Sequence, residues 1–216
     1  MTGFRPPLTM KSISCRFLFG KPVILVSGLP RSGTSMLMLM LKEAGMTIVC
    51  DHFRTADDDN PKGYHELERV KELDKTEEKS WLKNHRGEVI KIISFLLQDL
   101  PQNLNYKVIF MRRDLNEVLR SQNRMLARNG NADTSASDEK MYRNYDLHLR
   151  KVYYRLRRAP NFQVLYLDYP NVVADPRREA ERINAFLGGG LDPEKMAGAV
   201  DSELYRNRHA RADHAK

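Results

Sequence analysis

Residues 22–45 limit the fold of this chain more than any other part of the sequence. Residues 22–27 form an apolar, β-branched run, which is typical of a strand buried on both faces of a sheet. A glycine-bounded loop, residues 28–35, follows at once, and good helix formers then continue to Gly45, which suits the end of a helix. The order of strand, glycine loop and helix predicts an α/β architecture.

Strands and helices alternate along the rest of the chain. Further strands are predicted at residues 88–93, 106–111 and 162–168. Helices are predicted at residues 115–126, 138–158 and 176–187, and residues 64–75 carry apolar side chains at helical spacing. Asp114 is expected to cap the first of these helices. The pattern predicts three layers, α/β/α, around a central, mostly parallel sheet.

The length of the chain fits one domain. Its 216 residues are 41% hydrophobic, which is enough to bury a single sizeable core. We expect residues 1–21 to form an N-terminal arm, residues 22–200 the domain, and residues 201–216 a charged C-terminal tail.

Several features favour a cytoplasmic protein. No apolar run approaches the roughly 20 residues that cross a bilayer, so we expect no transmembrane anchor. The N-terminus is basic, but two early prolines and a short apolar centre make it a poor signal peptide. Cys15 and Cys50 are the only cysteines, and they lack metal-ligand spacing, so neither a disulfide framework nor a zinc site is expected.

The charge of the chain favours an anionic partner. Lys and Arg number 36 against 28 Asp and Glu, a formal net charge of +8, which attracts nucleotides, sulfated or phosphorylated small molecules, nucleic acid and membrane surfaces alike. A nucleic-acid-binding protein would carry a recognised module or aromatic residues within a basic stripe, and neither is found. We therefore expect no nucleic acid as a partner. The pattern of residues gives no indication of the oligomeric state.

The loop after the first strand has the spacing of a phosphate-binding loop. Gly28 and Gly33 are separated by four residues, and such a loop surrounds a phosphate with backbone N–H groups at the positive end of a helix. A nucleoside-triphosphate loop requires a lysine after its second glycine, but Thr34 stands there. Arg31 supplies a cation inside the loop instead, and its guanidinium can pair with a terminal anionic group. A tight turn without a ligand is the alternative interpretation.

Two motifs in this chain resemble those of the sulfotransferase family. The first is the loop for the 5′-phosphosulfate of 3′-phosphoadenosine 5′-phosphosulfate (PAPS), matched by Pro30, Arg31, Ser32, Gly33, Thr34 and Ser35. The second is an arginine at a strand end with a serine eight residues later, matched by Arg113 and Ser121, which in the family hold the 3′-phosphate. Ser121 would lie about two helical turns beyond Arg113, so both side chains can converge on one phosphate.

The resemblance covers about residues 22–190. Residues 60–64, with Glu66 after them, look like the acceptor-side segment of bacterial sulfotransferases, and residues 168–188 resemble their C-terminal strand and helix. The resemblance implies a P-loop-NTPase-like sulfotransferase fold that uses PAPS, releases 3′-phosphoadenosine 5′-phosphate (PAP) and needs no metal. The family segment that covers the adenine is not visible, and Arg206 and Arg208 are weak substitutes for it.

The chemistry of the transfer points to a further set of candidates. Positive charge must lie near the oxygen that leaves with the nucleotide, and Arg31 and the loop amides can supply it. By resemblance, Lys91 occupies the place of a catalytic lysine, although a lysine at a strand edge also fits a purely structural role.

The base that cytosolic family members use to take the proton of the acceptor is missing from this sequence. Cytosolic family members use a histidine two residues after the lysine, a position that is Ile93 here. By resemblance to bacterial and Golgi members of the family, which use a glutamate, Glu66 is our first candidate, although a glutamate among charged residues also fits a solvated surface position. Its neighbour His65 is the second candidate, because the usual histidine pKa of about 6.5 suits proton transfer. Histidines elsewhere are weaker candidates: His52, His85 and His148.

The predicted activity is the transfer of a sulfuryl group from PAPS to a hydroxyl or amine of an unknown acceptor. One alternative is a P-loop kinase or NTPase, in which Asp168 at a strand end would bind magnesium, although Thr34 argues against it. Another is a non-catalytic nucleotide-binding member of the fold.

Overall fold

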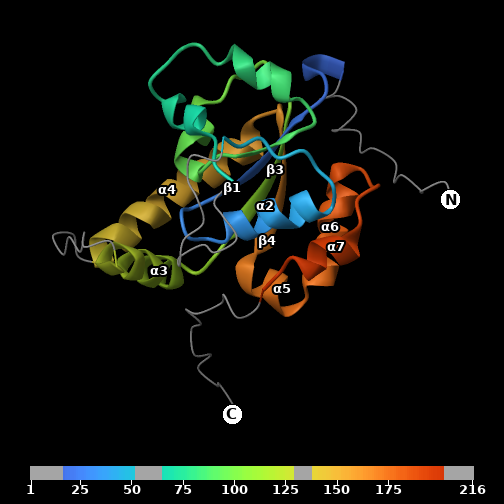
Figure 1. Ribbon diagram of the computed structural model, residues 1–216. Helices are drawn as coiled ribbons and strands as arrows, with labels where there is room; N and C mark the ends of the chain where they lie inside the picture. Colours follow the sequence, from blue (N-terminus) through green and yellow to red (C-terminus); the bar gives the residue numbers. More distant parts are fainter. Residues whose placement is uncertain (1–16, 52–64, 129–137, 202–216) are drawn as a thin grey trace.

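Four parallel strands form one sheet in the computed structural model, which describes residues 17–51, 65–128 and 138–201 (Figure 1). The strands are β1 (Val23–Gly28), β2 (Val89–Lys91), β3 (Tyr106–Arg112) and β4 (Phe162–Asp168). Their order in the sheet is β2-β1-β3-β4, and each described pair is parallel. The parallel sheet predicted from the apolar runs is confirmed.

Helices cover both faces of this sheet. They are α2 (Thr34–Glu43), α3 (Leu115–Arg128), α4 (Asp138–Arg158), α5 (Tyr169–Ala174), α6 (Pro176–Leu187) and α7 (Pro193–Gly198). Three short 3₁₀ helices lie between strands: η1 (Glu68–Glu72), η2 (Ser80–His85) and η3 (Ser94–Asp99). In Figure 1, α3 and α4 lie to the left of the sheet and α6 and α7 to its right.

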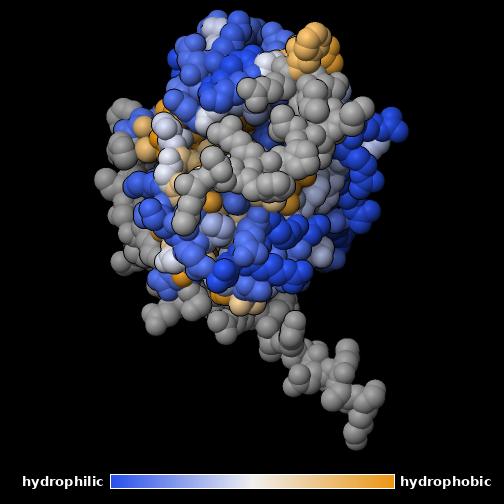
Figure 2. Space-filling view, turned by 90° about the vertical axis from the view of Figure 1, so that its right-hand side faces the viewer, coloured by the Kyte–Doolittle hydropathy of each residue, from blue (hydrophilic) through white to orange (hydrophobic). Residues whose placement is uncertain are grey.

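Alternation along the strands divides the core into two halves. Val23 and Leu25 of β1 pack toward α4 with its buried Val152. Ile24 and Val26 face the opposite way, toward α2, α6 and α7. Burial of both strand faces explains why β1 has no polar face, and it confirms the three-layer α/β/α architecture. Figure 2 shows that the face on the right of Figure 1 is mostly hydrophilic among its coloured atoms, as expected for the outer side of a covering layer.

The cap predicted for α3 is confirmed, and α6 has a cap of the same kind. The Asp114 carboxylate accepts hydrogen bonds from the backbone N–H groups of Asn116 and Glu117, at 2.9 and 3.1 Å, and so caps α3. Asp175 caps α6 by accepting from the N–H of Arg178 at 3.1 Å. Gly188, with φ 107°, then ends α6 in the left-handed conformation.

Two elements are shorter than predicted. The strand expected at residues 88–93 spans only Val89–Lys91, because the chain turns into η3 at Ser94. The helical spacing of residues 64–75 yields only η1, a single 3₁₀ helix, but Val70 and Leu73 are buried as that spacing requires. The short helices α5, α7, η2 and η3 were missed, since they have too few residues for a periodic pattern.

The end of the predicted N-terminal arm is bonded to the domain. Arg86 donates to the carbonyl oxygens of Phe19 and Lys21, at 2.7 and 2.6 Å. The side-chain amide of Asn105 donates to the carbonyl oxygen of Gly20 at 2.9 Å. Residues 1–16 of the arm and 202–216 of the predicted tail lie outside the described residues. Among the helices that the structure describes, none combines the length and the apolar character needed to span a membrane.

Candidate functional site

The glycine loop connects β1 to α2 at the carboxyl end of the sheet, where ligands bind in open α/β folds. Gly28, Gly33 and the non-glycine Arg31 all have positive φ, at 153°, 105° and 67°. A Cβ atom at Gly28 would lie 2.7 Å from the carbonyl oxygen of Met111, and one at Gly33 would lie 2.4 Å from Cδ2 of Tyr169. Both glycines are therefore required by close contacts as well as by conformation.

The hydroxyl groups of this loop have different partners. The Ser32 hydroxyl donates to the carbonyl oxygen of Leu29 at 2.7 Å, so it builds the loop itself. The Ser35 hydroxyl accepts from Nζ of Lys91 at 3.2 Å. The first turn of α2 contains no acidic residue and no side-chain cap. Its positive helix end is thus not neutralised from within the helix, which favours an anion there.

The structure brings Arg31, Arg113 and Ser121 together, although they are up to 90 residues apart. Arg31 donates through Nε to the Ser121 hydroxyl at 3.1 Å. Arg113 donates through Nη1 to the backbone carbonyl of Arg31 at 3.2 Å. Two arginines and a hydroxyl therefore meet beside the loop, a donor set suited to phosphate or sulfate.

Two residues that support Arg113 were not predicted from the sequence. Glu117 pairs with it at 2.9 Å, and only 4% of the Glu117 side chain and 6% of that of Arg113 are exposed. Tyr169 lies under the guanidinium, whose Cζ is 4.2 Å from the ring centroid. The separation of four residues gave no helical signal for this pair, because Arg113 precedes Asp114, the cap of α3, and so lies outside the helix. The Tyr169 contact has no signal in the sequence.

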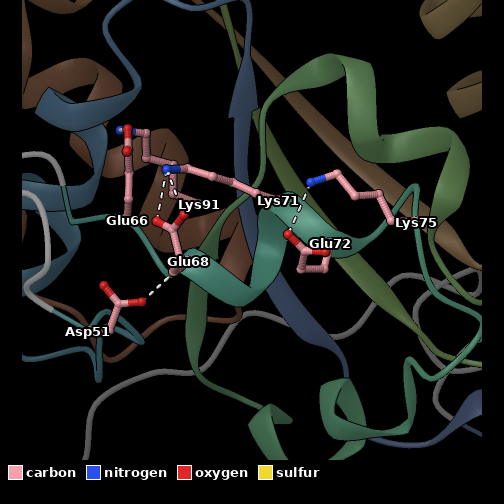
Figure 3. A network of polar contacts seen from close by, with 7 residues as sticks. All are labelled: Asp51, Glu66, Glu68, Lys71, Glu72, Lys75 and Lys91. Carbon is pink, nitrogen blue, oxygen red and sulfur yellow. Dashed lines mark hydrogen bonds and ion pairs between the residues drawn. The ribbon is translucent and has the colours of Figure 1, made fainter.

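A second group of predicted residues lies at the end of β2 (Figure 3). Nζ of Lys91 is 3.1 Å from a carboxylate oxygen of Glu66, as well as being bonded to Ser35. The Lys91 side chain is 6% exposed and that of Glu66 is 25% exposed, so solvent reaches the pair mainly through the carboxylate. His65, the second candidate base, has φ 48°, a left-handed conformation that is uncommon for such a residue.

The remaining candidates fall elsewhere or outside the described residues. Asp168 pairs with Arg112 at 2.7 Å, and His85 lies 2.7 Å from Glu88. Pro30 is half-buried in the loop and Thr34 is buried at the start of α2. His52, residues 60–64, Arg206 and Arg208 lie outside the described residues. No group of three or more potential metal ligands occurs in the part of the chain that is described.

His148 of α4 is placed against the start of η3. Its ring stacks on Phe95 at 3.9 Å, and Nε2 lies 2.9 Å from the Ser94 hydroxyl. Burial, aided by the positive charge of Lys151, lowers the pKa of His148 below its usual value of 6.5.

This pKa shift predicts a pH-dependent stability. The unfolded chain binds a proton at His148 more readily than the folded chain, so the stabilisation is complete above pH 6.5 and is lost as the pH falls through and below that value. Replacing His148 with Gln should reduce the loss of unfolding free energy between about pH 7.5 and about pH 5.5, measured by urea unfolding. An unchanged pH dependence in H148Q would contradict this expectation.

The fold and the two residue groups define the chain as an α/β protein with a glycine loop between β1 and α2 at the carboxyl end of its parallel sheet. The sulfotransferase domain family model matches residues 21–207. The chain therefore belongs to the sulfotransferase domain family, and it has the α/β sulfotransferase fold of a transferase.

Two solved sulfotransferase domains agree with this fold. The sulfotransferase domain of the olefin synthase of Synechococcus PCC 7002 is 18% identical, with 86% of this chain and 79% of that chain covered and a TM-score of 0.50. The sulfotransferase domain of the curacin biosynthetic pathway is 15% identical, with 86% of this chain and 89% of that chain covered and a TM-score of 0.51. Retinol dehydratase in complex with androsterone and inactive cofactor PAP is 17% identical, with 90% of this chain and 68% of that chain covered and a TM-score of 0.47. No curated protein matches the chain.

Proposed function

We propose that this chain transfers a sulfuryl group from PAPS to a hydroxyl or amine of an acceptor and releases PAP. The observation that carries the proposal is the meeting of Arg31, Arg113 and Ser121 beside a phosphate loop that lacks the lysine of triphosphate-binding proteins. These residues supply cationic and hydroxyl donors for two separate anionic groups of one nucleotide.

In this proposal the loop and the strand end hold different parts of PAPS. The backbone N–H groups of residues 30–35 and the start of α2 receive the 5′-phosphosulfate. Arg113 and Ser121 receive the 3′-phosphate. Glu117 and Tyr169 hold the Arg113 guanidinium in place from two sides, which reduces the entropy that the side chain loses when a ligand binds.

The transfer itself requires a cation at the leaving oxygen and a base at the acceptor. Lys91 and Arg31 are the proposed cations, and they stabilise the charge that develops when the bond from sulfur to the bridging oxygen breaks. Glu66 is the proposed base, with His65 beside it as the second candidate. The contacts of Lys91 with both Ser35 and Glu66 support this assignment, because they place the proposed base next to the first turn of α2.

The kinase alternative finds less support. A magnesium-binding aspartate would have to present its carboxylate to the metal, but Asp168 pairs with Arg112 at 2.7 Å. We also place the activity in the cytoplasm, a prediction that rests on the two cysteines, which lack the spacing of a disulfide framework, and that cell fractionation would test.

Calorimetric binding of PAP, AMP and magnesium-ATP tests the nucleotide assignment. We expect PAP to bind at least about 30-fold more tightly than AMP, since its extra phosphate adds about 2 kcal/mol through Arg113 and Ser121. A preference for magnesium-ATP would instead support a kinase or NTPase. Binding of PAP without formation of PAP from PAPS, in the presence of a panel of phenols, sugars and amines, would identify a non-catalytic member of the fold.

A further inference from the structure

The position of Glu66 is fixed by a residue that no sequence motif identified. Glu66 belongs to no helix or strand, and it follows His65, whose left-handed backbone is strained. Its carboxylate nevertheless lies 3.1 Å from Lys91. Such a geometry requires that the surrounding backbone be fixed by other contacts.

Asp51 makes those contacts on both sides of Leu67. Its backbone N–H donates to the carbonyl oxygen of Glu66 at 3.2 Å. Its carboxylate accepts a hydrogen bond from the backbone N–H of Glu68, the first residue of η1 (Figure 3). The residue at the N-cap position of η1, Leu67, has no side-chain acceptor, so Asp51 supplies the cap from a distant part of the chain.

Asp51 is itself fixed to the edge of the sheet. The N–H of Val49 donates to the carbonyl of Val89, and the N–H of Val89 donates to the carbonyl of Thr47, each at 2.9 Å. Residues 47–49 thus run parallel beside the start of β2, and Asp51 and Lys91 leave this edge at the same end. Asp51 and Lys91 are therefore both anchored to the sheet edge formed by residues 47–49 and β2. The Glu66 segment is hydrogen-bonded to this edge through Asp51.

We propose that Asp51 is a positioning residue, which sets the Glu66 carboxylate opposite Lys91 and Ser35. The role of Glu66 as base rests on the proposed function, but its placement by Asp51 does not. Loss of the Asp51 carboxylate removes the cap of η1 and leaves one of the two described Asp51 contacts beside Glu66. Misplacement of a reacting group by a fraction of a hydrogen-bond length is enough to slow a transfer reaction.

Crystal structures of D51A and D51N test the placement directly, whether or not the chain transfers sulfuryl groups. In D51A, the distance from the Glu66 carboxylate to Nζ of Lys91 is expected to exceed 4.0 Å, the limit for an ion pair. This distance is 3.1 Å in the unaltered chain. In D51N, whose side-chain oxygen can still accept from Glu68, the pair is expected to persist. A Glu66–Lys91 pair that stays at its present distance in D51A overturns the proposal.

Kinetics then test the consequence, with PAPS and 2-naphthol as substrates and PAP release as the readout. We expect D51A to lower kcat at least about ten-fold while the Kd of PAP changes by less than about two-fold, and D51N to retain most of the rate. Asp192→Ala is the control, because the Asp192 carboxylate also accepts backbone N–H groups at the start of a helix, α7, as the N-cap residue of that helix and away from Glu66. It should leave kcat nearly unchanged.

A double-mutant cycle separates positioning from general destabilisation. If Asp51 acts through Glu66, adding D51A to E66Q should lower kcat by less than about two-fold beyond E66Q alone. An equal loss in both backgrounds would overturn the proposal. Absence of PAP release from the unaltered chain would instead count against the proposed function, and the crystal structures would still decide the role of Asp51.

Discussion

Replacing Arg113 with Ala is expected to weaken PAP binding at least about 30-fold, or about 2 kcal/mol, and to leave AMP binding nearly unchanged. The guanidinium is almost fully buried and held by Glu117 and Tyr169, so no other side chain can readily take its place. Because AMP lacks the 3′-phosphate, the difference between the two ligands isolates the proposed contact. Calorimetry of both nucleotides with both proteins gives the four affinities required.

The neighbouring Arg112 provides the control for this experiment. It follows Met111 in the same strand, but its side chain is 44% exposed and pairs with Asp168. Arg112→Ala should therefore change PAP affinity by less than about three-fold. Equal losses in the two variants would show that Arg113 acts only through the overall charge of the protein.

Stability must be measured beside affinity, because Arg113→Ala leaves the Glu117 carboxylate buried without its cation. Breaking a buried pair in this way costs about 3–5 kcal/mol. The double variant Arg113→Ala with Glu117→Gln should recover a large part of this stability in urea unfolding but none of the PAP affinity. Recovery of both would mean that Arg113 serves only to neutralise Glu117.

Gly33→Ala is expected to have the second large effect, on stability and binding together. Alanine at φ 105° costs roughly 1–2 kcal/mol, and a Cβ atom 2.4 Å from Tyr169 adds overpacking of roughly 1–3 kcal/mol. Movement of Tyr169 would also disturb Arg113 above its ring. We expect PAP affinity to fall at least about ten-fold, which corresponds to about 1.4 kcal/mol.

Gly188→Ala is a closely matched control for this variant. Gly188 has φ 107°, nearly the same backbone conformation, but a Cβ atom there would have no neighbour within 4 Å. It should therefore show the conformational cost of roughly 1–2 kcal/mol alone, with PAP binding unchanged. If urea unfolding gives the same loss for both variants, the contact between Gly33 and Tyr169 contributes nothing.

The sequence predicted the framework of the fold because its main elements carry strong local patterns. The strand at β1 is uniformly apolar, and α4 shows one apolar stripe over its whole length, so both were located almost to the residue. β2 was overestimated, since Ile92 and Ile93 are as apolar as a strand requires. Only the turn into η3 ends it, and the start of that helix depends on tertiary packing.

The candidate site was predictable only where a motif carries it. Arg31, Arg113 and Ser121 were named because they match motifs of the sulfotransferase family, but the hydrogen bond from Arg113 to the backbone carbonyl of Arg31 has no counterpart in a pattern of side chains. The bond from Asp51 to the main chain of Glu68 is hidden for the same reason. Contacts between distant backbone and side-chain atoms depend on how the elements pack, which periodicity and motif spacing do not encode.

The two contacts of Arg31 have a consequence for how binding energy is distributed. Its side chain reaches Ser121, and its carbonyl receives Arg113, so the loop and the end of β3 form one hydrogen-bonded unit. In the proposed function, a phosphate that engages Arg113 and Ser121 also stiffens the loop that would hold the reacting sulfate. The two halves of the nucleotide would then bind cooperatively. Part of the free energy of binding the 3′-phosphate would be used to orient the group to be transferred.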